Sequence, residues 1–300
     1  MVYVFALLAA CANALSSVAQ RAANKDLPSS HNLRPRLILD LLHDPRWFFG
    51  ICGIIAGFLL QAAALSAGPL AIVEPILIVE LPLTLFLGGL AFGQPMHRRE
   101  WIATGAMTLG LAGMLYFLAP SGGTSNHVSW DLWLPAVGAT LAVIAVLVAL
   151  AQHRRVGQLP SAALLGIATG TAFGLTAAFI KAMTDVLDQR GFAAVFTTWQ
   201  TYAMVVSGCG AMFLLQSALN AGPLVAAQPG FTIADPIVSV LWGVVVFDED
   251  VRQGPLLVVA VASAALLGWG ILRLSRSPQL SESETANSPT RSQRSQPNPG

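Results

Sequence analysis

Three carboxylates stand well inside long apolar runs of this sequence, namely Glu74, Glu80 and Asp235. An ionised acid near the centre of a bilayer costs about 2.5–3.5 kcal/mol on insertion scales, so such a residue is a candidate for function. Burial disfavours the charged form of a carboxyl group, which suits the uptake and release of a proton. A carboxylate also suits Mg²⁺, which usually takes one or two acids and keeps several waters. These residues therefore favour the handling of a proton or a cation.

The spacing of the polar residues predicts which of them share a helix face. Gln228 and Asp235 are seven residues apart and lie on one face, whereas Glu74 and Glu80 are six apart and do not. We expect a substrate or ion pathway that includes Glu74, Gln228 and Asp235. Glu80 is either a fourth member of this pathway or a residue that points at a neighbouring helix, and the sequence leaves both interpretations open.

Each of the two runs also contains two prolines seven residues apart, Pro75 and Pro82 in one and Pro229 and Pro236 in the other. Proline lacks an N–H group and leaves the carbonyl four residues earlier unpaired. We therefore expect helix breaks at all four positions. Weakened backbone of this kind is tolerated in a membrane where it lines a cavity or is covered by neighbours. The alternative is a plain kink in a packed helix.

The composition predicts the elements that position these residues. Apolar residues make up 55% of the 300 residues and charged residues 10%, against roughly 25% charged in a soluble domain. The apolar runs approach the ~20 residues that a helix needs to cross a membrane, and they lack the alternation of barrel strands. We predict an all-α membrane protein with nine transmembrane helices, at about residues 2–20, 47–67, 70–91, 100–118, 132–151, 160–183, 194–217, 224–247 and 255–273.

The sequence also repeats itself. Residues 64–70 (ALSAGPL) read against residues 218–224 (ALNAGPL), and the two proline pairs match at the same offset. Five spans separate the copies, and because five is odd the copies have opposite orientations, as in many secondary transporters. The alternative is a duplicated bundle that is only a scaffold. The predicted 4+1+4 organisation is a first repeat at 1–122, a connector helix within 123–157, a second, inverted repeat at 158–274, and a disordered cytoplasmic tail at 275–300.

A weaker match pairs residues 15–21 with residues 175–181, and it places Arg21 and Lys181 at equivalent positions on opposite membrane faces. They are either gate charges that steer an anionic solute or snorkelling anchors. Gly166, Gly170 and Gly174 form a smooth stripe that permits close helix contact. Tryptophans at predicted span ends, among them Trp133, are expected to be interface anchors.

The paired segments ALSAGPLAIVEP and ALNAGPLVAAQP, together with LLGIATGTAFGLTAAFIKA, resemble the drug/metabolite transporter (DMT) superfamily over roughly residues 2–274. Nine spans look more like its NIPA-type magnesium transporter-like branch than its ten-span EamA-like branch. The resemblance implies an inverted-repeat helical bundle that works by alternating access. It is a poor guide to the solute, because the superfamily carries metabolites, amino acids and drugs as well as cations.

No enzyme signature is present: the histidines lack metal-ligand spacing and there is no phosphate-binding GxxxxGK[ST] loop. We therefore expect no enzyme activity, cofactor, resident metal or nucleic-acid partner. The predicted function is a secondary transporter or exporter of a small solute, with H⁺ as a candidate coupling ion. A magnesium or other divalent-cation transporter is the alternative, and a non-transporting scaffold or receptor is another. The expected partners are the lipid bilayer and a small-molecule or cation substrate, and a homodimer is left open because the sequence does not define the oligomeric state.

The distribution of basic residues predicts the orientation. Thirteen of the 16 Lys and Arg residues lie in alternate loops that share one side, which the positive-inside rule makes cytoplasmic. With nine spans, the N-terminus is then outside the cell (inner) membrane and the C-terminus is cytoplasmic. A reporter fused after residue 274 should behave as cytoplasmic, and a periplasmic-type signal there would contradict the nine-span count.

Overall fold

The computed structural model describes residues 1–25, 45–93, 96–125, 128–154 and 156–275. Within these residues, nine helices are long and apolar enough to cross a membrane, which confirms the predicted all-α membrane fold. The expected tail lies outside the described residues, apart from Ser275. The elements are α1 (Val2–Lys25), α3 (Pro45–Ala67), α4 (Leu70–Leu77), α5 (Glu80–Phe92), α6 (Arg98–Leu118), β1 (Ser121–Gly122), α7 (Trp130–Ala151), α8 (Gln158–Arg190), α9 (Phe192–Val195), α10 (Trp199–Ala221), α11 (Leu224–Val245), β2 (Glu249–Asp250) and α12 (Leu256–Leu274).

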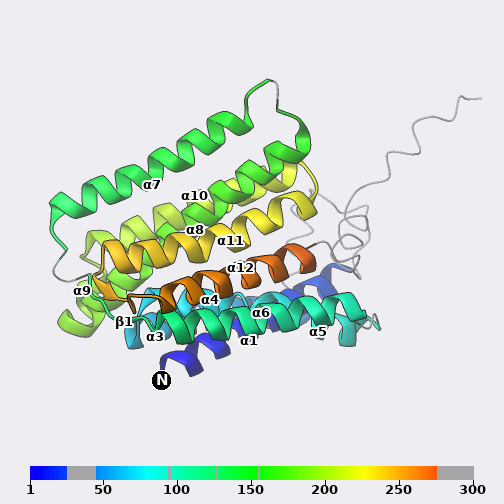
Figure 1. Cartoon of the computed structure of the whole chain (residues 1–300), viewed down its shortest axis with the longest axis horizontal. Helices are drawn as coiled ribbons and strands as arrows, with labels where there is room; N and C mark the ends of the chain where they lie inside the picture. Colours follow the sequence, from blue (N-terminus) through cyan, green and yellow to red (C-terminus); the bar gives the residue numbers. More distant parts are fainter. Residues whose placement is uncertain (26–44, 94–95, 126–127, 155, 276–300) are drawn as a thin grey trace, which may run out of the picture.

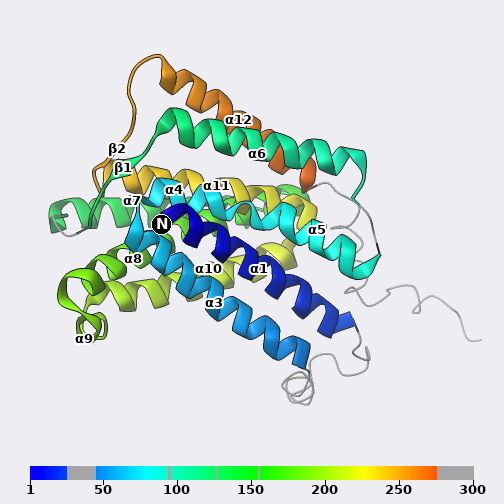
Figure 2. The same cartoon turned by 90° about the horizontal axis from the view of Figure 1, so that it is seen from below.

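The long helices lie side by side along the molecule (Figure 1). α1 packs along α3, α8 packs along α10, and α6 packs along α12. Figure 2 shows α6 beside α12 at one edge and α1 beside α3 at the other. The antiparallel pair β1–β2 lies at the same end of the bundle as the N-terminus, and we call this end the strand end. The pairs α1–α3 and α8–α10 occupy equivalent places in the predicted repeat, whose inverted 4+1+4 arrangement stays a prediction.

The third span is interrupted between α4 and α5, at Ile78 and Val79. Pro82 has no N–H to donate to the carbonyl of Ile78, which instead accepts from the N–H of Leu81 at 3.1 Å in a tighter turn. A small, partly open hollow lies beside this break, between its residues and those of α6 and α12. Beyond the break the packing changes, because α4 contacts both α1 and α11 whereas α5 packs mainly against α1.

The expectation of a break at every proline is wrong for three of the four. α4 continues through Pro75, and α11 continues through both Pro229 and Pro236. α11 is packed extensively against α8, and neighbouring helices can support a helix where proline removes its own hydrogen bonds. Of the four prolines, Pro82 is the one whose missing N–H group would have bonded to a carbonyl at an interruption of the helix.

Close contact between α8 and α11 depends on residues that have no side chain. Gly166, Gly170 and Gly174 follow one stripe of α8 and face α11, as their spacing predicted. A methyl group added at Gly170 would lie 2.5 Å from the carbonyl oxygen of Phe231. The backbones of the two helices are therefore nearly in contact, which leaves no room for a larger residue.

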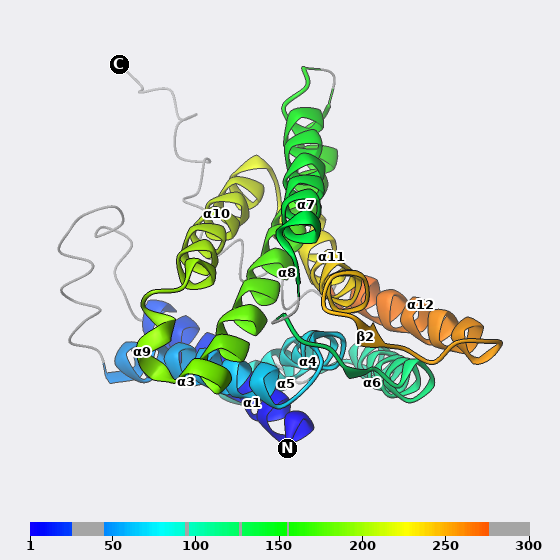
Figure 3. The same cartoon turned by 90° about the vertical axis from the view of Figure 1, so that its left-hand side faces the viewer.

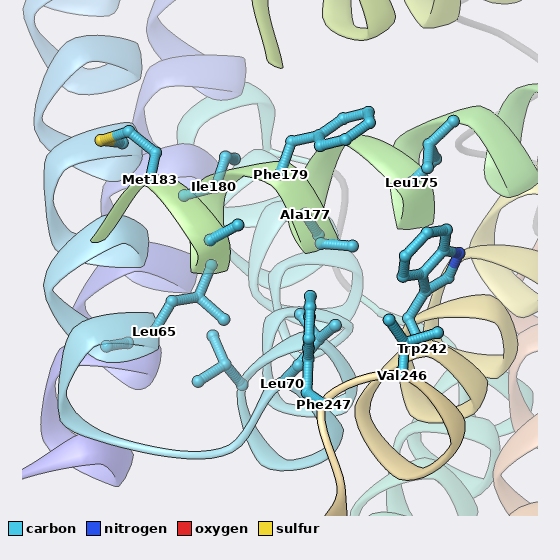
Figure 4. Close-up of a cluster of buried hydrophobic side chains, with 14 of the residues drawn as sticks. Leu65, Leu70, Leu175, Ala177, Phe179, Ile180, Met183, Trp242, Val246 and Phe247 are labelled. Carbon is cyan, nitrogen blue, oxygen red and sulfur yellow. The ribbon is translucent and has the colours of Figure 1, made fainter. Parts of the chain in front are cut away.

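The largest cluster of buried apolar side chains joins α3, α4, α8 and α11 (Figure 4). It includes Leu65, Leu70, Phe179 and Trp242. Trp133 of α7 stacks on Phe179, with ring centroids 5.9 Å apart. Because Trp133 is only 4% exposed, the expectation that it is an interface anchor is wrong, and the residue instead fastens α7 to the core.

The helices differ strongly in how much of their surface they bury. In the most apolar stretch of α8, 72% of the residues are buried, whereas 6% are buried in the corresponding stretch of α7. Figure 3 shows α8 in the middle of the bundle and α7 projecting from it. α8 is thus the central element of the fold, and α7 presents most of its side chains to the surroundings.

Gly170→Ala should lower the free energy of unfolding by about 1–3 kcal/mol, since an added methyl group forces the α8 and α11 backbones apart. The matched control is Gly210→Ala in α10, where a methyl group would meet nothing within 4 Å. That change should be neutral or stabilising, because alanine favours a helix over glycine by about 1 kcal/mol. Thermal unfolding in detergent measures both variants, and equal midpoints would contradict the close contact.

Candidate functional site

Glu74 and Asp235 approach one another where α4 packs against α11. The side chain of Glu74 is 4% exposed, and its charge acts on the carboxyl group of Asp235. The two carboxyl groups repel each other when both are ionised. The structure thus brings together two of the acids that the sequence singled out, one from each half of the predicted repeat.

Two amide side chains from other helices bind acids in this region. Nε2 of Gln61, on α3, donates a hydrogen bond to Oε1 of Glu74 at 2.8 Å. Asn13, on α1, hydrogen-bonds the carboxyl group of Glu80. Glu80 therefore points at a neighbouring helix, one of the two interpretations that its spacing allowed. Each amide orients its acid without adding a charge.

Several polar atoms on α11 have no hydrogen-bond partner among the described residues. They are Oε1 of Gln228, Oδ1 of Asp235 and Oγ of Ser239. The side chain of Gln228 is buried, and Ser239 lies one turn beyond Asp235, next to it. In the described part of the chain no ion pair links Glu74 or Asp235 to a basic side chain. Unpaired buried acceptors are costly, so this region is suited to a proton or a positively charged ligand.

A second polar cluster lies toward the strand end and contains Lys181, which is 4% exposed. Its Nζ donates to the carbonyl oxygen of Leu65 at 2.9 Å and lies 3.1 Å from Oδ1 of Asp185. Oδ2 of Asp185 accepts from the N–H of Ser125 at 2.7 Å and from its hydroxyl at 2.8 Å. The snorkelling interpretation of Lys181 is therefore wrong, because α8 continues past the predicted span end and keeps the residue inside the protein. The side chain of its repeat mate, Arg21, lies outside the described residues.

Glu249 of β2 completes this second cluster by capping α4. Its Oε1 accepts from the N–H of Leu70 at 2.5 Å and its Oε2 from the N–H of Ala71 at 3.0 Å. A carboxylate here also interacts favourably with the positive end of the helix dipole. Burial raises the pKa of Glu249 above its ordinary value, while the two backbone donors and Lys181 act in the opposite direction and the charge of Asp185 raises it further.

Sequence reasoning missed several residues of these clusters. Asp185 had a usable signal, since an acid four residues after Lys181 lies one helical turn away from it. Gln61 had a weaker one, as a polar residue inside an apolar run. Glu249 had none, because its partner at the start of α4 is 179 residues away in the chain. The sequence of a loop does not show which distant backbone N–H groups one of its side chains will cap.

The chain was compared with known proteins. No protein-family model matches it, and no solved structure matches it significantly. It is 29% identical over 246 residues to an uncharacterized protein of Corynebacterium glutamicum. This alignment covers 82% of this chain and 84% of that protein. It is 24% identical over 281 residues to a protein of Arabidopsis thaliana described as the probable magnesium transporter NIPA9, over 89% of this chain and 78% of that protein. These similarities and the multi-span helical fold are consistent with a membrane transporter.

Lys181→Met should destabilise the protein by about 3–5 kcal/mol, since it leaves the charge of Asp185 buried without a base. Adding Asp185→Asn in the same chain should recover part of this loss. Arg190→Met, in the exposed last turn of α8, is the matched control and should change stability little. Thermal unfolding in detergent measures all three, and a Lys181 variant as stable as the Arg190 variant would refute the buried ion pair.

Proposed function

We propose that the protein is a membrane transporter of a small solute or cation, and that a cation or proton binds between Glu74 and Asp235 during its cycle. The observation that carries this proposal is that the buried acid Glu74 and the half-buried acid Asp235 lie on the packed helices α4 and α11, where the charge of one acts on the other without a basic partner among the described residues. Desolvation and mutual repulsion both disfavour two charged carboxylates in such a place. A bound positive charge relieves both costs, so the pair prefers a cation.

A divalent cation that keeps part of its water is the cargo that these residues fit best. Mg²⁺ usually takes one or two carboxylates and retains several waters, and Glu74 and Asp235 supply two. The unpaired oxygens of Gln228 and Ser239 are acceptors for hydrogen bonds from such waters. In the described ranges no group of three or more His, Cys, Asp or Glu gathers at one place, so the ion would remain hydrated. The distant similarity to a probable magnesium transporter supports the same class of cargo.

The second candidate is export of a small solute driven by H⁺. Oδ1 of Asp235 has no partner in the described structure, so it is available to carry a proton. Protonation of one acid would remove the repulsion in the pair as a cation does. On this reading the acids couple an ion gradient to a solute that binds elsewhere between the two halves.

We further propose that the two halves of the bundle, residues 1–122 and 158–274, form the inverted repeats and alternate in opening the site to either side. α4 and α11, which carry the facing acids, then belong to different halves. The protein would lie in the cell membrane with its N-terminus outside. The basic-residue bias and the shared helix pairing of α1–α3 and α8–α10 support this arrangement.

Ion flux into proteoliposomes tests the proposal. Vesicles that enclose a magnesium-sensitive dye report Mg²⁺ entry, and vesicles that enclose a pH dye report H⁺ movement. We expect the wild-type protein to move one of these ions. Asp235→Asn should keep the fold and lower the flux at least tenfold, since an amide cannot balance a cation or exchange a proton, and Glu74→Gln should do the same.

The matched control is Asp131→Asn, an exposed acid in the first turn of α7 that lies outside the site. This variant should retain wild-type flux. Normal flux in Asp235→Asn and Glu74→Gln would refute the role of the acid pair. Absence of both Mg²⁺ and H⁺ flux in the folded wild-type protein would instead favour a scaffold or receptor.

A further inference from the structure

Two segments that are distant in sequence cover the strand end of the bundle together. The segment after α6 pairs with the segment after α11 through β1 and β2, in the register Ser121 with Asp250. Further backbone hydrogen bonds join Thr124 to Phe247 at 3.0 Å and Arg252 to Leu118 at 2.9 Å. β1 ends the first predicted half and β2 belongs to the other half, so their pairing ties the two predicted halves at this end.

The same cover is bound to the start of α4 and to α8 by buried side chains. Glu249 accepts hydrogen bonds from the N–H groups of Leu70 and Ala71. A Cβ atom added at Gly123 or Gly243 would collide with its side chain and force that side chain to move. Asp185 of α8 holds Ser125 in the other segment. Lys181 bridges Asp185 to the carbonyl at the end of α3. The turn between α3 and α4 is thus held by a side chain of β2 and a side chain of α8, an arrangement that we call the clamp.

α4 connects this clamp to the candidate cation site. The helix has eight residues, from the capped N–H of Leu70 to the break at Ile78, and Glu74 lies one turn after the cap. The helix has only about two turns, so Glu74 lies close to the residues that Glu249 holds. A change in the position of Glu74 on cation binding is therefore transmitted to the residues that Glu249 holds.

The sequence places this clamp at one end of the predicted repeat. Arg21 is the repeat mate of Lys181, but the residue four positions later is Lys25 in the first copy and Asp185 in the second. Two bases one helical turn apart repel, so the first copy does not contain the acid–base pair that the second copy uses. The sequence of the first copy therefore has no equivalent of Asp185.

We propose that Glu249, Lys181 and Asp185 form a gate that closes the strand end and must release α4 before cargo passes that end. This inference rests on the proposed transport function. The gate is opened when the carboxyl group of Glu249 leaves the first turn of α4. Its opening frees two backbone N–H groups, which water satisfies once it enters.

Reactivity of a buried thiol tests the gate. The three native cysteines are replaced by alanine, and Thr184→Cys introduces one thiol on the Lys181 face of α8, at a residue that is 1% exposed. A polar maleimide should label this thiol slowly in the otherwise wild-type protein in detergent. Glu249→Ala should raise the labelling rate at least tenfold, because it removes two hydrogen bonds to a charged group and the loss of one alone has about that effect. Glu249→Gln, which keeps an acceptor oxygen, should give an intermediate rate.

The matched control is Asp250→Asn, the exposed acid next to Glu249 in the same strand. It should leave the labelling rate unchanged. A monodisperse Glu249→Ala protein that is labelled at the wild-type rate would overturn the gate, as would an equal increase in the control.

Hydrogen exchange of the wild-type protein gives a second reading if Glu249→Ala does not fold. The amides of Leu70 and Ala71 and those of residues 247–252 should exchange at one common rate, at least tenfold faster than those of Gly166–Gly174 on α8. Exchange as slow as in that stretch would overturn the gate. Both readouts are independent of flux, so a protein that carries no ion can fail the function proposed above and still show an opening strand end.

Discussion

Hydrocarbon supplies no hydrogen-bond partner, and this constraint decides how each helix that ends inside the bundle is completed. α3 ends and α4 begins at a turn flanked by the buried residues Leu65 and Leu70, and the helix ends there have carbonyl and N–H groups without helical partners. Lys181 binds a carbonyl oxygen on one side of the turn, and Glu249 binds two N–H groups on the other. Both charged side chains come from the second half of the chain. The backbone of the first half is therefore completed by side chains of the second, which makes the two halves interdependent at that point.

The same constraint explains why four similar prolines have different effects. α11 lies against α8 with almost no side chains between their backbones, and it remains regular through Pro229 and Pro236. The third span has α1 beside both of its parts but is packed against α11 only along α4, so α5 beyond the break has less support. Its helix is interrupted at Ile78, whose carbonyl receives no N–H from Pro82 and pairs with the N–H of Leu81 instead. A proline thus weakens a helix, and the neighbouring helices decide whether it breaks.

Much of the fold was predictable because lipid imposes simple rules on sequence. Nine apolar runs gave nine spans, and the glycine stripe of α8 identified a close helix contact. The acids Glu74 and Asp235 were conspicuous because charges are rare in such runs, and the repeat suggested that they meet. The role of Glu249 could not be predicted, because it binds backbone N–H groups, which every residue but proline possesses. The burial of Lys181 was missed because α8 extends well past the length that hydropathy required.

α7 is fastened to the rest of the bundle near its two ends, by Trp133 and by Ala151, while most of the residues between them face outward. Residues that face lipid need only be apolar and compatible with a helix. Exchanges among leucine, valine, isoleucine and alanine along this helix are therefore close to neutral, and its sequence is free to drift. Between Trp133 and Ala151 we expect related proteins to resemble each other in hydropathy and length rather than in residue identity. An alignment would thus understate their kinship most in the helix that joins the two halves.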